Sequence, residues 1–143
     1  PTPLCVGFGI ACRLMLERRE PDRVKIELLR KRLWDGIHSG NPSSVINGSE
    51  LHRHPGNLNI CFRGHDAVSV LGTLQPSLAA STGSACTTGI PEPSHVHTAI
   101  GLSAEDAESS IRFGIGRFTT DDEIDRAIVL LSEALIQSKR AVA

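Results

Sequence analysis

The chain has 143 residues, of which 40% are apolar, and its 15 basic and 16 acidic residues give a formal net charge of -1. This length suits one domain with its own hydrophobic core, and the apolar share is ordinary for a globular protein. The charge balance argues against a nucleic-acid-binding surface, which needs a basic excess. No run of 18 apolar residues predicts a membrane span.

The first quarter of the chain is predicted to be helical. Apolar residues mixed with glycines indicate a helix over residues 4–19, and apolar residues recur at helical spacing in a second helix over residues 24–37. Asp22 is the expected N-cap of the second helix. Because the chain begins with Pro1 rather than methionine and opens almost directly into a helix, we expect it to be a segment of a longer protein.

Short strands and helices are predicted to follow in the rest of the chain. The strands expected from alternation and turn signals cover residues 44–46, 57–62, 78–81 and 111–115. Helices are expected after Asp66, before Gly101, after Ser103, and after the capping-box pair Thr120 and Glu123. This order predicts an α+β fold, with helices on one side of a small, mainly antiparallel sheet.

The segment over residues 80–89 carries the clearest chemical signal, because it places Cys86 among glycine, serine and threonine. A nucleophilic thiolate needs access and polar surroundings, whereas a buried structural cysteine normally lies on an apolar stripe. Glycines on both sides allow the backbone to move, which a nucleophile that delivers to a second site requires. The pattern alone leaves two interpretations open, a reactive cysteine and an incidental surface thiol.

The four cysteines are widely spaced: Cys5, Cys12, Cys61 and Cys86. They match neither a disulfide framework nor paired zinc ligands, which favours a reducing compartment such as the cytoplasm. Potential metal ligands lie close together at His52, His54, Cys61 and His65. Their spacing fits no common structural zinc site, so we expect no metal. A base for Cys86 is possible at His95 or His97, although a histidine on a helix face is commoner.

Four motifs follow one another in the second half of the chain: Ser81–Cys86, Glu92–Val96, Ser110–Phe113 and Gly116–Thr120. Together with Asn57-Leu58-Asn59 ahead of them, they resemble cysteine desulfurases of the NifS/IscS type in order and spacing. The resemblance covers nearly the whole chain. It implies the small C-terminal domain, residues 21–143, of a fold-type I enzyme that uses pyridoxal phosphate. Residues 1–20 would then be the helix that leads in from a large cofactor-binding domain.

The resemblance also implies a reaction. Cys86 is expected to take the sulfur of L-cysteine as a persulfide, leaving L-alanine, and to pass it to an acceptor protein for iron–sulfur cluster assembly or thiolation. Pyridoxal phosphate would act as the electron sink. Arg112 matches the family's arginine that binds the substrate carboxylate, since a guanidinium offers two parallel hydrogen bonds. Arg117 also matches the family pattern, and we favour a structural role for it.

Most of the cofactor site is expected to lie outside this chain. The family's Schiff-base lysine belongs to an upstream His-Lys motif, whereas the lysines here are Lys25, Lys31 and Lys139, each in a predicted helix. The resemblance implies a homodimer when the protein is full-length, and the cysteine pattern favours the cytoplasm. The missing lysine motif predicts that the isolated segment is inactive. Two alternatives remain: a sulfur-carrier or redox domain without enzymatic activity, and a selenocysteine lyase.

Overall fold

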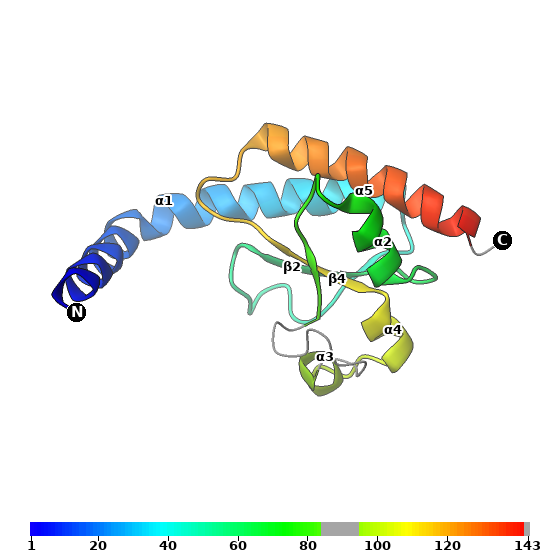
Figure 1. Ribbon diagram of the computed structural model, residues 1–143, viewed down its shortest axis with the longest axis horizontal. Coiled ribbons are helices and arrows are strands. Elements are labelled where there is room, and N and C mark those ends of the chain that lie inside the picture. The colour runs from blue at the N-terminus through cyan, green and yellow to red at the C-terminus, as the bar shows by residue number, and fades with distance from the viewer. Residues whose placement is uncertain (84–94, 142–143) are drawn as a thin grey trace.

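The computed structural model describes residues 1–83 and 95–141. Its elements are α1 (Thr2–Gly40), β1 (Val45–Ile46), β2 (Asn57–Cys61), α2 (Ala67–Leu74), β3 (Ser81–Thr82), α3 (His95–Ala99), α4 (Ala104–Glu108), β4 (Ser110–Gly114) and α5 (Asp121–Ala141). The C-terminal part of α1 lies beside α5 (Figure 1). The N-terminal part of α1 extends away from the rest of the molecule (Figure 1).

The described strands form one sheet in the order β1-β2-β4-β3, and every pairing in it is antiparallel. Strands β2 and β4 pair along their full length, with Asn59 opposite Arg112. Because side chains alternate along a strand, Leu58 and Ile60 face the core while Asn57 and Asn59 face the other way. The expected α+β fold with a small antiparallel sheet is therefore confirmed.

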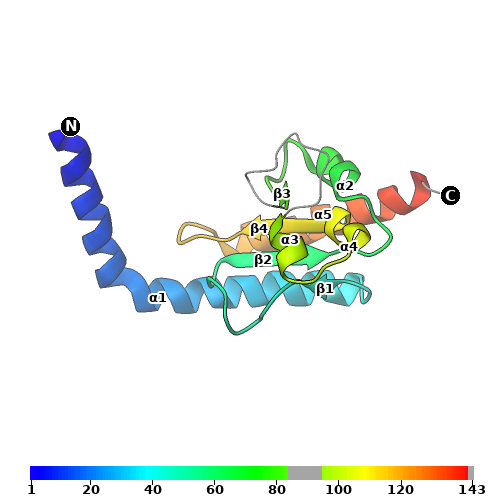
Figure 2. The same ribbon diagram turned by 90° about the horizontal axis from the view of Figure 1, so that it is seen from below.

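The hydrophobic core lies on one face of the sheet. Helices α1, α2 and α5 bury apolar side chains there against β2 and β4, and the largest fully buried ones are Phe62, Leu33, Leu58, Ile60, Leu74, Ile111 and Leu131. The expectation that all helices lie on one side is wrong, because α3 and α4 contact the opposite face of β2. His97 of α3 hydrogen-bonds Asn59, and Asp106 of α4 contacts Cys61. The polar face of the sheet is thus partly covered (Figure 2).

Helix α1 differs from the expected pair of helices, since it runs without a break from Thr2 to Gly40 and contains Pro21. A proline inside a helix removes one hydrogen bond and clashes with the preceding turn, which bends the helix without ending it here. The bend is visible in Figure 2. Asp22 is consequently not an N-cap but lies 3.2 Å from the guanidinium of Arg117. Lys25 Nζ also donates to the Arg117 carbonyl at 2.9 Å, so the bend is tied to the segment after β4.

The other expected helix ends are confirmed by their hydrogen bonds. The Asp66 carboxylate accepts the N–H three residues later at 2.8 Å, and the Ser103 hydroxyl does the same at 3.0 Å. Thr120 and Glu123 bond each other's backbone N–H reciprocally, as a capping box requires. Helix α3 is followed by Gly101 at φ +84°, a left-handed conformation that favours glycine.

The strand expected over residues 78–81 is displaced and shortened to β3, Ser81–Thr82. The Leu78 N–H still donates to the Leu74 carbonyl at 3.0 Å, so the first residue of the expected strand belongs to the turn that ends α2. No helix in the described part of the chain is both long and apolar enough to span a bilayer.

Candidate active site

A row of polar side chains crosses the sheet on the face opposite the core. Arg112 of β4 pairs with Ser81 of β3 on one side and with Asn59 of β2 on the other. Asn47, directly after β1, continues the row because its N–H donates to the Asn59 carbonyl at 2.9 Å. Residues opposite one another on antiparallel strands share a face, so the pairing alone brings these four side chains together.

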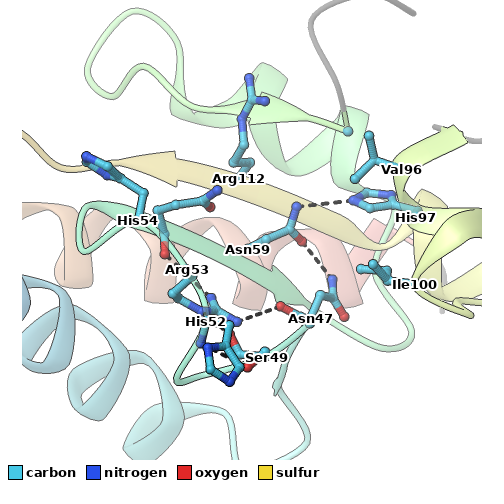
Figure 3. Close-up of a pocket in the computed structure, with 13 residues that line it drawn as sticks. Asn47, Ser49, His52, Arg53, His54, Asn59, Val96, His97, Ile100 and Arg112 are labelled. Atoms are coloured by element: carbon cyan, nitrogen blue, oxygen red, sulfur yellow. Dashed lines mark hydrogen bonds between the residues drawn. The ribbon is translucent and has the colours of Figure 1, made fainter.

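A cavity of about 350 Å³ opens over this row, lined by Asn47, Gly48, Ser49, His52, Arg53, His54, Asn57, Asn59, Gly83, Val96, His97, Ile100 and Arg112. Its volume is at the lower end of small-molecule sites, roughly 300–1,000 Å³. Arg112, Asn59 and His97 reach it from β4, β2 and α3 (Figure 3). Among the described residues of the lining there are two arginines, three histidines and no acidic side chain, which suits a small anion.

Arg112 is the sequence-predicted site residue that the structure places in this cavity. Its side chain is half-buried, and one terminal nitrogen donates to the Ser81 hydroxyl at 3.1 Å. None of the ion pairs formed among the described residues involves Arg112. The serine steadies the guanidinium while leaving most of its donors for a ligand, which is the arrangement that bidentate carboxylate binding needs.

A chain of hydrogen bonds lies beside Arg112. Asn47 Nδ2 donates to Asn59 Oδ1 at 2.7 Å and to the Ser110 hydroxyl at 2.8 Å, and Asn59 Nδ2 lies 3.1 Å from His97 Nε2. His97 is 2% exposed. Burial, and then the charge of Arg112, lower the pKa of His97 below its usual range, so its ring is neutral near neutral pH.

Arg53 has a different task from Arg112 although both line the cavity. Its guanidinium donates to the carbonyls of Asn47 at 2.8 Å and Ser49 at 2.6 Å, with a longer contact to that of Asn57. It therefore holds the segment between β1 and β2 in one shape. The sequence pattern did not indicate this role, because the partners are backbone carbonyls that no motif records.

The histidine and cysteine cluster of the sequence is dispersed by the fold. His52 and His54 lie at the cavity, whereas Cys61 is buried beneath α4 and His65 Nδ1 lies 3.2 Å from the Ser138 hydroxyl of α5. Over residues 1–83 and 95–141 no group of three His, Cys, Asp or Glu side chains is arranged to hold a metal ion.

The cysteines differ in surroundings. Cys5 and Cys12 are exposed on α1, and Cys61 is buried against Asp106, with which its thiol makes a 3.5 Å contact. Burial and the Asp106 carboxylate raise the pKa of Cys61 to about 11, so it is a thiol and not a nucleophile at neutral pH. Cys86 lies outside the described residues, while Gly83, three positions before it, lines the cavity.

The described residues that line the cavity include no lysine that could hold pyridoxal phosphate as a Schiff base. Lys25 donates to the Arg117 carbonyl, and Lys31 pairs with Asp35 one turn away on α1. Both are exposed and belong to the helix layer on the core side. The described residues of this chain therefore do not fit the cofactor by themselves.

Comparison with known proteins defines the class. A family model described as "Aminotransferase class-V" matches residues 1–127, and the chain therefore belongs to this family. Within it, the chain is 46% identical over 131 residues to cysteine desulfurase IscS of Rickettsia typhi. It is also 44% identical over 128 residues to the cysteine desulfurase of Homo sapiens. These alignments cover 92% and 90% of this chain but only 32% and 28% of the relatives, so the chain spans about a third of their length.

Solved structures agree with this assignment. A NifS-like protein from Rickettsia africae superimposes with a TM-score of 0.75 at 26% identity, covering 90% of this chain and 33% of that one. DndA from Streptomyces lividans superimposes with a TM-score of 0.62 at 31% identity, covering 81% of this chain and 32% of that one. The resemblance inferred from the motifs is thereby confirmed for the family and the fold.

Proposed function

We propose that this chain is the small-domain part of a cysteine desulfurase, and that Arg112 binds the carboxylate of L-cysteine. The observation that carries the proposal is a half-buried guanidinium in a small polar cavity, steadied by Ser81 and without an ion-pair partner among the described residues. A bare arginine of this kind favours a carboxylate ligand, because the fork of donors matches the two oxygens.

Cys86 is proposed as the residue that accepts the substrate sulfur. Its thiolate attacks the sulfur of L-cysteine, so that an S–S bond forms while the substrate's C–S bond breaks. The electron pair stays on the carbon, which becomes L-alanine after protonation. Support comes from the motif around Cys86, from Gly83 at the cavity, and from the unsuitable setting of Cys61. The persulfide sulfur would then pass to the thiol of an acceptor protein.

The cofactor and the remaining domain are also part of the proposal. Pyridoxal phosphate, which the family uses, would supply an electron sink at the substrate carbon when bound. The lysine that holds the cofactor would lie in the two-thirds of the relatives' length that the alignments leave uncovered. Residues 1–20 would contact that larger domain within a cytoplasmic homodimer, since Leu4, Val6 and Phe8 are 71%, 56% and 74% exposed in this chain.

The main rival function is a sulfur-carrier domain without enzymatic activity. A carrier does not need an arginine that binds the substrate carboxylate. The two functions also differ in their products, because only the desulfurase releases L-alanine. With sulfur-labelled L-cysteine, the full-length protein is expected to release one L-alanine for each sulfur that reaches protein. Label on the protein without any alanine would favour the carrier. Turnover of selenocysteine but not of cysteine would favour a selenocysteine lyase.

The chain on its own is expected not to retain pyridoxal phosphate, because Lys25 and Lys31 are engaged on α1 away from the cavity. Mixing the two and dialysing should leave no Schiff-base absorbance band. A band that persists, and that disappears when Lys25, Lys31 or Lys139 is replaced, would show that a lysine of this chain holds the cofactor.

A further inference from the structure

The direction of every hydrogen bond in the chain beside Arg112 is fixed by one backbone carbonyl. The Ser110 hydroxyl donates to the Asp106 carbonyl at 2.6 Å, so its oxygen can only accept from Asn47. The Asn47 group at that point is therefore the NH₂, and its second hydrogen goes to Asn59 at 2.7 Å. The Asn59 atom facing Asn47 must be the carbonyl oxygen, and the opposite end of the Asn59 amide must be the NH₂.

This polarity determines the state of His97. The Asn59 NH₂ is 3.1 Å from His97 Nε2, so Nε2 has to accept and the ring proton has to be on Nδ1. A histidine with a proton on Nε2 would set two donors against each other. The 2% exposure of His97 prevents water from relieving that conflict. The buried ring can therefore hold the Asn59 amide only while it is neutral.

We propose that Asn59 is a second hydrogen-bond donor to the substrate carboxylate beside Arg112, and that neutral His97 is the positioning residue that aims it. The Asn59 NH₂ has two hydrogens, and His97 uses one of them. Asn59 is directly opposite Arg112 on the neighbouring strand, and both side chains line the same cavity, so the other hydrogen is left for a ligand bound there. This proposal rests on the proposed function, because it assumes a carboxylate at Arg112.

Protonation of His97 should interrupt this arrangement. The charged or titratable groups that line the same cavity, within the described residues, are Arg53, Arg112, His52 and His54. Among these, Arg112 acts on the His97 ring electrostatically and disfavours its charged form, as burial also does. A pH below the usual range of histidine pKa values is therefore needed to place a proton on Nε2 and turn the Asn59 amide away.

The first test reads the ring directly. In the full-length protein with nitrogen-labelled histidine, nuclear magnetic resonance distinguishes a protonated from an unprotonated ring nitrogen, and the His97→Gln spectrum assigns the signal. At neutral pH we expect Nδ1 protonated and Nε2 bare. A proton on Nε2 would overturn the proposal whatever the kinetics show.

The second test is kinetic. His97→Leu removes the acceptor that holds the Asn59 amide. It is expected to raise KM for L-cysteine about tenfold, which is the effect of losing one hydrogen bond to a charged group, with little change in kcat. His97→Gln should restore most of the affinity, since its carbonyl oxygen can accept the Asn59 N–H at any pH. The wild-type KM should rise as the pH falls through the lowered pKa of His97, and His97→Gln should lose this rise.

His95→Gln is the matched control, because His95 is exposed on the same helix and does not line the cavity. Its KM should equal that of the wild type. If Arg112→Lys raises KM while His97→Leu keeps a wild-type KM and pH profile, only the role of Asn59 and His97 is overturned. If Arg112→Lys also leaves KM unchanged, the proposed function fails first.

Discussion

Replacing Cys86 by serine is expected to abolish alanine release in the full-length protein. Cleavage of the substrate's C–S bond needs an acceptor for the sulfur, and a serine hydroxyl keeps its proton at neutral pH and would give an unstable oxygen–sulfur product. Binding of L-cysteine should survive, because the carboxylate site at Arg112 needs no thiol from the protein. Assays for alanine and for labelled persulfide, together with a binding measurement, separate the two steps.

The other cysteines are not expected to rescue the Cys86→Ser protein. Cys61 is 1% exposed, and its pKa of about 11 leaves almost no thiolate at neutral pH. Cys5 and Cys12 are exposed on α1, and neither lines the cavity. Single replacements of these three residues serve as controls and should retain activity. Activity that survives in Cys86→Ser and disappears in Cys61→Ser would move the nucleophile to β2.

Replacing Arg112 by lysine is expected to raise KM for L-cysteine far more than it changes the free energy of unfolding. Lysine keeps the positive charge but loses the fork that binds both carboxylate oxygens. Losing a hydrogen bond to a charged group costs roughly 1.5–3 kcal/mol, which corresponds to about ten- to a hundredfold in affinity. The fold should tolerate the change, because the described contacts of the guanidinium include a single side-chain hydrogen bond, to Ser81.

Arg63→Lys is a matched control for this substitution. Arg63 is an exposed arginine whose guanidinium pairs with the partly exposed Asp106 outside the cavity, and an ion pair open to solvent contributes little to stability. Steady-state kinetics on both variants, with thermal unfolding as a check on the fold, should show a raised KM for Arg112→Lys alone. Wild-type kinetics in Arg112→Lys would remove this residue from the substrate site.

Local sequence patterns were sufficient for most of the secondary structure. The alternation of Leu58 and Ile60 with Asn57 and Asn59 predicts β2 and its buried face, because a strand has only two faces. Caps are equally local, so Asp66 and Ser103 gave correct helix starts. The prediction failed at Pro21, where contacts of Asp22 and Lys25 with Arg117, more than ninety positions away, accompany a continuous bent helix.

The sequence by itself determined the family and the candidate residues Cys86 and Arg112, because both lie in continuous motifs. Only the tertiary structure decided what surrounds Arg112. Ser81 and Asn59 become its neighbours through strand register, which no local pattern encodes. His97 reaches Asn59 because α3 packs over the polar face of β2. The physical reason is that antiparallel pairing and helix docking join positions dozens of residues apart, and the chemistry of a buried amide or imidazole depends on the partner it meets there.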